Sequence, residues 1–200
     1  MRHETDGVTQ SLIESAKNEF LEHGFRDASM RRISAANGVS TNSIYTRFGD
    51  KAGLFRAIVK EAADGLMNIY LDSIKKAAYS ADVSQAIHHG DEGTELTLNY
   101  IFSHKKEFQL IFCHSSGSEY EDYFDRLALI EENYYGEFAK KYTNGKHNID
   151  VFFLHVYCRT GWQHIYEILT HDKTYEEAEK YMDNVRIFNY AGWKAILETG

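Results

Sequence analysis

No proline interrupts the 200 residues of this chain, and this absence constrains the fold more than any other feature. Proline lacks a backbone N–H and fixes one backbone angle, so it ends or kinks helices. Long segments instead carry apolar residues every three or four positions, which is the spacing of one helix face. We therefore predict an all-α fold with helices over residues 9–23, 30–37, 41–48, 51–79, 84–103, 105–114, 120–142, 149–170 and 174–198, and breaks at residues 90–93, 115–118 and 144–148.

Short polar residues mark the predicted helix ends. Ser29, Ser40 and Asp50 each stand just before a predicted helix, where a side-chain oxygen can accept a hydrogen bond from the first turn. Gly38 stands between two of these helices, where glycine readily adopts the left-handed conformation that ends a helix. Residues 1–8 are polar and carry no helical pattern, so we expect a frayed terminus.

The formal net charge of -8 is unevenly distributed along the chain. From Arg26 to Lys51 there are five Lys or Arg against two Asp, whereas residues 52–200 carry 15 basic and 23 acidic side chains. Affinity for DNA depends largely on neutralising phosphates, so only the N-terminal part suits a polyanionic partner. We predict a three-helix head, residues 1–52, joined by a long helix to a helical body, residues 53–200.

One short helix of the head is unusually polar. The stretch from Asn37 to Lys51 reads NGVSTNSIYTRFGDK, and within it Ile44 and Phe48 are spaced to point inward. The other side chains of this helix are short hydrogen-bonding groups, one Tyr and one Arg, which can reach base edges and phosphates from the major groove of DNA. The alternative is an ordinary solvated helix face.

The motifs around this helix follow a known order and spacing. An amphipathic first helix ends in a Gly, the second helix and its turn read ISAANGVS (Ile33 to Ser40), and the third reads IYTRFGDK (Ile44 to Lys51). Over about 45 residues, from Ser11 to about Leu54, this pattern resembles the DNA-binding domain of the TetR family of transcriptional regulators.

The resemblance implies that residues 40–48 form a recognition helix in the major groove. Its leading turn would contact base edges, with Arg47 one turn later, while Tyr45 and Lys51 would hold the DNA backbone. The alternative for the charged residues is a plain surface position, and for Tyr45 it is packing between helices. The predicted DNA-contacting residues are Ser29, Arg31, Ser40, Thr41, Asn42, Ser43, Tyr45, Arg47 and Lys51.

Met30 departs from the pattern of the family, which usually has a Thr hydroxyl to help grip a phosphate at this position. Either Ser29 replaces that hydroxyl or the contact is absent, so we expect a weaker grip on DNA that Met30→Thr would strengthen.

The family also implies a homodimer on a palindromic operator, because one short helix reads few base pairs and two heads read two half-sites. The last two predicted helices carry apolar stripes that suit a four-helix interface across a two-fold axis. The alternative is that both stripes are buried in the core of one chain. The predicted interface residues are Trp162, Ile165, Leu169, Val185, Phe188, Gly192 and Ile196.

The middle of the chain is rich in aromatic residues, which either fill the core or line a cavity. The resemblance implies a small-molecule effector that binds the body and releases DNA. Further candidates for the lining are Tyr100, Tyr123, Tyr134, Tyr135, Phe152, Phe153, Tyr157 and Tyr166. The predicted effector-contacting residues are Phe102, Glu107, Phe108, Phe112, His114, Tyr120, Phe124, His155 and Trp162.

Other functional classes find little support in the sequence. Cys113 and Cys158 lie far apart, and neither a leader peptide nor a long apolar run appears, so we expect a cytoplasmic protein with free thiols and no membrane partner. We interpret His88 and His89 as part of a solvated loop and predict no metal, cofactor or catalytic residue. The alternatives are a protein-interaction module with a degenerate head and a metal-dependent helical-bundle enzyme.

Overall fold

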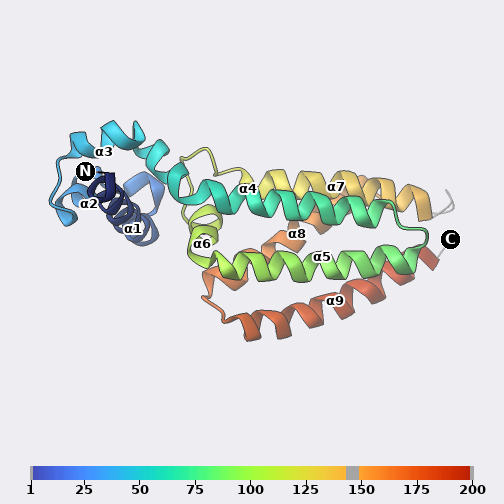
Figure 1. Cartoon of the computed structure of the whole chain (residues 1–200). Helices are drawn as coiled ribbons and strands as arrows, with labels where there is room; N and C mark the ends of the chain where they lie inside the picture. The colour runs from blue at the N-terminus through green and yellow to red at the C-terminus, as the bar shows by residue number, and fades with distance from the viewer. Residues whose placement is uncertain (1, 143–148, 199–200) are drawn as a thin grey trace. The chain divides into compact units, whose positions relative to one another are not determined.

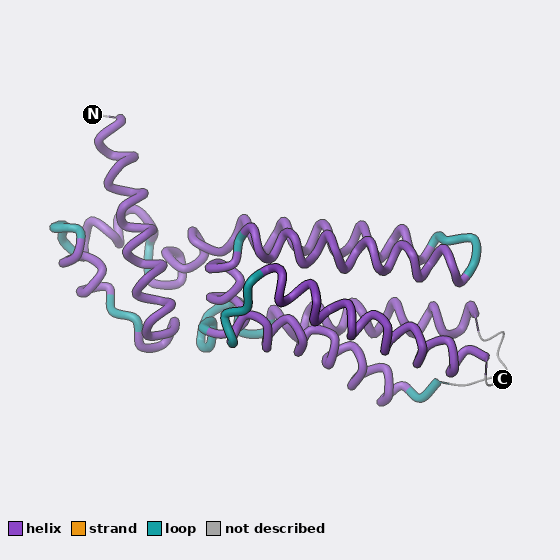
Figure 2. The backbone as a smooth tube through the Cα atoms, turned by 90° about the horizontal axis from the view of Figure 1, so that it is seen from below, coloured by secondary structure: helices purple, strands orange, loops and turns teal. Residues whose placement is uncertain are grey.

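The protein is described here by a computed structural model that covers residues 2–142 and 149–198. Over these residues the chain forms helices and no strand, which confirms the all-α prediction (Figure 2). The elements, in chain order, are α1 (Arg2–Asp27), α2 (Met30–Ala36), α3 (Thr41–Phe48), α4 (Lys51–Ala78), α5 (Val83–Ser103), α6 (Lys105–Cys113), α7 (Tyr123–Tyr142), α8 (Val151–Thr170) and α9 (Tyr175–Glu198).

The first helix is longer than predicted. α1 begins at Arg2, so the expected frayed terminus over residues 1–8 is wrong for residues 2–8. A polar sequence without proline does not prevent a helix, because the outward face of a helix needs no apolar residue. At Gly24 the backbone turns out of the helix with φ 72°, and the N–H of Phe25 then donates to the carbonyl of His114 at 2.8 Å.

The predicted break at residues 90–93 is also wrong, because α5 runs through it. A Cβ on Gly93 would lie 2.7 Å from the Cβ of Ser73, so this glycine permits close packing of α4 and α5 instead of ending a helix. His88 and His89 therefore lie on α5 and not in a loop. His89 Nδ1 is 3.0 Å from Ser80 Oγ. The predicted break at residues 115–118 is present between α6 and α7, and residues 144–148 lie outside the described part of the chain.

The chain divides into two compact units. The first consists of Met1–Asp64 and His104–Tyr123, and the second of Gly65–Ser103 and Phe124–Gly200. The first unit takes in residues 104–123 because α6 packs on α1. The predicted domain boundary between residues 52 and 53 stays a prediction.

A cluster of aromatic rings holds the first unit together. The ring of Phe55 packs edge-on against Phe20 and Phe25, with centroids 5.0 and 5.3 Å apart. Met30 and Ile33 from α2 and Ile44 from α3 are also buried, so both short helices are anchored by apolar residues on their inner face.

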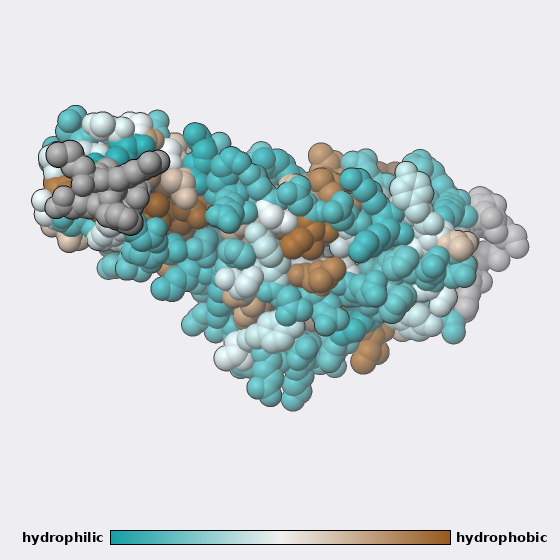
Figure 3. Space-filling view, viewed as in Figure 1, coloured by the Kyte–Doolittle hydropathy of each residue, from teal (hydrophilic) through white to brown (hydrophobic). Residues whose placement is uncertain are grey.

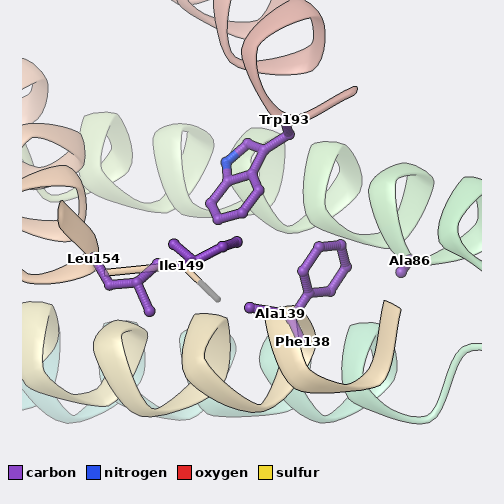
Figure 4. Packing of buried hydrophobic residues seen from close by; sticks show 6 residues of the cluster. All are labelled: Ala86, Phe138, Ala139, Ile149, Leu154 and Trp193. Carbon is purple, nitrogen blue, oxygen red and sulfur yellow. The ribbon is translucent and has the colours of Figure 1, made fainter. Parts of the chain in front are cut away.

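In the second unit, α5, α7, α8, α9 and the C-terminal part of α4 lie side by side (Figures 1 and 2). Trp193 points from α9 toward Phe138 of α7 and Ile149 (Figure 4). Its indole stacks on the ring of Tyr135 with centroids 4.9 Å apart and planes 7° from parallel. Aromatic pairs of this kind stabilise a core beyond the area that they bury.

The visible face of the molecule is mostly hydrophilic, with separate apolar patches (Figure 3). Among the described residues, no helix combines the length and the low polarity that crossing a membrane would require.

Candidate functional site

Two capped helices and a tight turn form the candidate nucleic-acid interface. Ser29 Oγ accepts a hydrogen bond from the N–H of Arg32 at 3.4 Å, and Ser40 Oγ accepts one from Ser43 at 3.2 Å. Between the helices, Gly38 has φ 62°, a conformation that glycine adopts without steric cost. Helix α2, the turn and α3 therefore form a helix-turn-helix, as predicted.

Glu19 of α1 fixes the start of α2. Its Oε1 accepts a hydrogen bond from the N–H of Ser29 at 2.7 Å and another from Nε of Arg32 at 2.9 Å. Burial by itself would raise the pKa of Glu19, but the hydrogen bonds from Arg32 and Ser29 and the charge of Arg32 outweigh it, so the pKa is lowered. The carboxylate is thus held ionised at the junction of the two helices.

The outer face of α3 carries the predicted base-contacting residues. Asn42 is exposed, Tyr45 is 45% exposed, and Thr41 and Ser43 are half-buried. Arg47 lies back along the helix, where its Nη1 donates to the carbonyl of Ser43 at 3.0 Å.

Lys51 lies at the first turn of α4 and also makes contacts within the chain. Its Nζ donates to the carbonyl of Arg26 at 2.8 Å and lies 5.0 Å from the centroid of the Phe25 ring. Arg31 is exposed on α2. All nine predicted DNA-contacting residues thus belong to the first unit, and they lie on α2, α3, their N-caps and the start of α4.

Met30 does not occupy a surface position. Its side chain is buried in the first unit, so a Thr hydroxyl at residue 30 would face the core. The expectation that Met30→Thr would strengthen a phosphate contact stays a prediction, and the burial of Met30 argues against it, while the Ser29 hydroxyl caps this helix start.

Five of the nine predicted effector-contacting residues lie on α6 or in the segment that follows it. They belong to the first unit because α6 packs on α1. Glu107 pairs with Nζ of Lys17 at 2.7 Å, and Phe108 is fully buried. The ring of Phe112 packs on Tyr123, and that of Tyr120 packs on Phe55. The carbonyl of His114 accepts a hydrogen bond from Phe25, and burial lowers the pKa of its imidazole.

The remaining predicted residues lie in the second unit. The ring of Phe102 packs edge-on against Tyr175, and Phe124 is half-buried. His155 Nδ1 is 2.9 Å from an oxygen of Glu132. Trp162 differs from the other eight residues, because it lines a cavity.

This cavity lies wholly within the second unit and has a volume of about 250 Å³. Of the aromatic candidates named from the sequence, Tyr134, Tyr135 and Tyr157 line it. The sequence interpretation missed its carboxylate, Glu131, although Glu131 shares one helix face with Tyr134, Tyr135 and Phe138 at spacings of three, four and seven. The aromatic and acidic lining residues are Tyr70, Asp91, Glu131, Tyr134, Tyr135, Phe138, Tyr157, Trp162, Tyr190 and Trp193.

Glu131 is the most perturbed carboxyl group beside the cavity. Burial raises its pKa to about 8, although hydrogen-bonding contact with Tyr70 and Trp162 acts in the opposite direction. At neutral pH the side chain is therefore mostly protonated when the cavity is empty.

The predicted dimer residues are divided between core and surface. Trp162, Ile165 and Leu169 are buried within one chain, so this part of the interface prediction does not fit the fold. Val185 lines the cavity, and Ile196 packs against the core cluster around Trp193. Phe188 and Gly192 are exposed on α9. Other exposed apolar side chains of the last two helices are Val151, Phe152, Val156 and Ile187.

Within residues 2–142 and 149–198, no cluster of three or more His, Cys, Asp or Glu side chains is arranged to hold a metal ion.

Comparison with known proteins links the helix-turn-helix to one family. Residues 12–58 match the family described as "Bacterial regulatory proteins, tetR family". A 54-residue segment is 43% identical to the HTH-type transcriptional repressor AcnR of Corynebacterium glutamicum, covering 27% of this chain and 29% of that protein. A 64-residue segment is 33% identical to AcnR of Corynebacterium diphtheriae, covering 32% of this chain and 34% of that protein. The chain therefore spans about a third of the length of these relatives.

Solved structures share the fold over nearly the whole chain. A TetR-family transcriptional regulator from Syntrophomonas wolfei is similar with a TM-score of 0.63 and 17% identity, covering 98% of this chain and 99% of that one. A transcriptional regulator from Pseudomonas aeruginosa PAO1 is similar with a TM-score of 0.56 and 15% identity, covering 90% of each chain. The residues that match the TetR family of bacterial regulatory proteins, 12–58, are those that contain the helix-turn-helix.

Proposed function

We propose that this chain is a transcriptional repressor that binds a palindromic DNA operator as a homodimer and is released by a small molecule bound in its helical body. The observation that carries the proposal is the outer face of α3, where Asn42 and Tyr45 are exposed while Ile44 alone is fully buried. Such a helix presents its polar groups to a major groove while its buried residue keeps it packed against the rest of the head.

The relatives support repression as the output. AcnR, of which a 54-residue segment matches this chain, is named a transcriptional repressor. As a DNA-binding regulator the protein would act in the cytoplasm, and we assign no residue a catalytic role. Helix α4 contributes residues to both compact units, so it is the element that would carry a ligand-induced change from the body to the head.

The test is selection of bound duplexes from a random pool, followed by fluorescence-anisotropy titration of the selected operator at fixed salt. Tyr45→Ala and Lys51→Ala should weaken binding to all duplexes alike, and loss of the Lys51 charge should reduce the salt slope by about 1. Thr41→Ala and Asn42→Ala should instead change sequence preference, at about 1–3 kcal/mol for each lost base contact.

Lys75→Ala is the matched control, because Lys75 is an exposed lysine of α4 that belongs to the second unit. It should leave operator affinity unchanged. If the pool yields no defined palindrome and binding disappears at moderate salt, the protein is an interaction module with a degenerate head, and the proposal is wrong.

A further inference from the structure

Aromatic rings form the walls of the cavity in the second unit. Tyr135 stacks on Trp193, and Tyr157 stands edge-on to both, with centroids 5.3 Å from each. On another part of the wall, Tyr70 stands edge-on to Trp162 at 5.0 Å. The faces of such rings carry partial negative charge and attract cations.

Glu131 places a carboxyl group among these rings. Its Oε2 is buried and has no hydrogen bond of good geometry, although the Tyr70 hydroxyl and the Trp162 indole lie close enough to lower the pKa of the carboxyl group. Opposite it on α8 stands Gly161, where even an added Cβ would lie 3.7 Å from Oε2, so no side chain of that residue covers the carboxyl group. A buried carboxyl oxygen without a partner is costly, and a cation would satisfy it.

The other titratable groups of the cavity do not replace this partner. Arg186 is half-exposed and pairs with Asp183, and Asp91 has its pKa raised by burial. His164 lies 2.6 Å from the hydroxyl of Tyr181, and burial lowers the pKa of its imidazole, which keeps it neutral. Tyr70, Tyr157 and Cys158, from α4 and α8, have raised pKa values because of burial and also remain neutral.

We infer that this cavity binds a compact organic cation, with the positive charge beside Glu131 and the apolar part among the aromatic rings. An anion would be repelled by the Glu131 carboxylate, and a neutral ligand without a hydrogen-bond donor would leave Oε2 without a partner. The volume of about 250 Å³ is below the ~300–1,000 Å³ typical of drug-sized sites, so the ligand is small. The binding stands by itself, and only its effect on DNA depends on the proposed function.

Binding should be linked to proton release. A cation beside Glu131 favours the ionised carboxylate, so it lowers a pKa that is about 8 in the empty cavity. Below pH 8 the carboxyl group must lose its proton to bind, so affinity should rise with pH by up to about tenfold per unit and level off above pH 8.

The chain provides its own optical probe for this inference. Its two tryptophans are Trp162 and Trp193, and both line the cavity, so intrinsic fluorescence reports on occupancy. The full-length protein would be titrated with benzyltrimethylammonium chloride and with neopentylbenzene, which has the same shape but no charge. A quaternary ammonium also keeps its charge at every pH.

At pH 8.5 the cation should bind roughly tenfold or more tightly than its neutral isostere, and the preference should shrink toward pH 6.5. Glu131→Gln should reduce the preference to what the aromatic rings alone provide and abolish its dependence on pH. The control is Glu132→Gln, because Glu132 is the next residue of α7 but contacts His155 and does not line the cavity. Equal or tighter binding of neopentylbenzene by the natural protein would overturn the inference without any variant.

Cation binding and operator binding can be measured independently on the same protein, so the ligand class and the proposed function can fail separately. Cation binding without operator binding would leave the ligand class standing and contradict the repressor. Operator binding without cation binding would leave the repressor standing and contradict the organic cation as the ligand class. If both hold, benzyltrimethylammonium should weaken the operator complex of the natural protein but not that of Glu131→Gln.

Discussion

At the scale of single residues, Glu19 connects the first helix of the head to the helix-turn-helix. It is nearly buried, yet it receives hydrogen bonds from the N–H of Ser29 and from Arg32. Since Ser29 is also the N-cap of α2, one carboxylate connects α1 to the beginning of the helix-turn-helix. The family motif does not include this residue, so sequence reasoning had no reason to select it.

Glu19→Gln should therefore destabilise the head, because it removes the charge that pairs with Arg32 and places an NH₂ group where Oε2 accepts a hydrogen bond from Nε of Arg32. We expect the free energy of unfolding to fall by about 1–3 kcal/mol at pH 7, in the range of hydrogen bonds to charged groups. The pKa of Glu19 is lowered from 4.5 in the folded state, so its contribution is present above pH 4.5 and is lost as pH falls through the lower folded value.

Urea unfolding from pH 7 to pH 3 would show the difference between the natural protein and Glu19→Gln narrowing at acid pH. Glu14→Gln serves as the control, since Glu14 is an exposed carboxylate on the same helix. A difference that stays constant with pH would mean that the Glu19 carboxylate has no special role.

At the scale of elements, helix ends could be predicted from the sequence where neighbouring residues alone determine them. Ser29, Ser40 and Asp50 cap the helices that they precede, because an N-cap needs only its own side chain and the next turn. The break predicted at residues 90–93 failed because Gly93 serves a contact with α4, a helix distant in sequence. Sequence alone does not separate a glycine that ends a helix from one that lets another helix approach.

Gly53 is a second glycine of this kind, in the first turn of α4. A Cβ there would lie 1.9 Å from the carbonyl oxygen of Phe48, a backbone atom at the end of α3. Gly53→Ala should lower the free energy of unfolding by about 1–3 kcal/mol, as overpacking does.

In α7, Gly136 has open space around its Cβ position, so Gly136→Ala should raise the free energy of unfolding by about 0.5–1 kcal/mol. Thermal denaturation of both variants tests the pair, and stabilisation by both would contradict the close approach.

At the scale of the whole molecule, the all-α fold class could be predicted from the sequence, but the lining of the cavity could not. Aromatic residues were recognised, yet five of the nine predicted effector residues belong to the first unit. Which face of a helix meets a cavity depends on its neighbours, and the packing of α6 on α1 is not encoded within α6. Glu131 could have been found from its register with Tyr135 and Phe138, since a carboxyl group on an apolar face is informative.

The same scale includes the proposed dimer, for which α8 and α9 retain exposed apolar residues. Phe188 is 77% exposed, and Tyr181 lies seven residues earlier on the same face of α9. On α8, Phe152 and Val156 are exposed one turn apart. One such face from each helix in two copies would form a four-helix interface of the kind that a two-fold axis generates.

Phe188→Arg should separate this dimer, because it would bury a guanidinium charge without a partner. Light scattering after size-exclusion chromatography should then give 23.1 kDa for the variant and about twice that mass for the natural protein. Operator affinity should fall with the dimer, because a single head contacts one half-site. Tyr79→Arg is the control, since Tyr79 is 88% exposed but follows α4 and belongs to neither α8 nor α9. A Phe188→Arg protein that keeps the dimeric mass would place the interface on other residues.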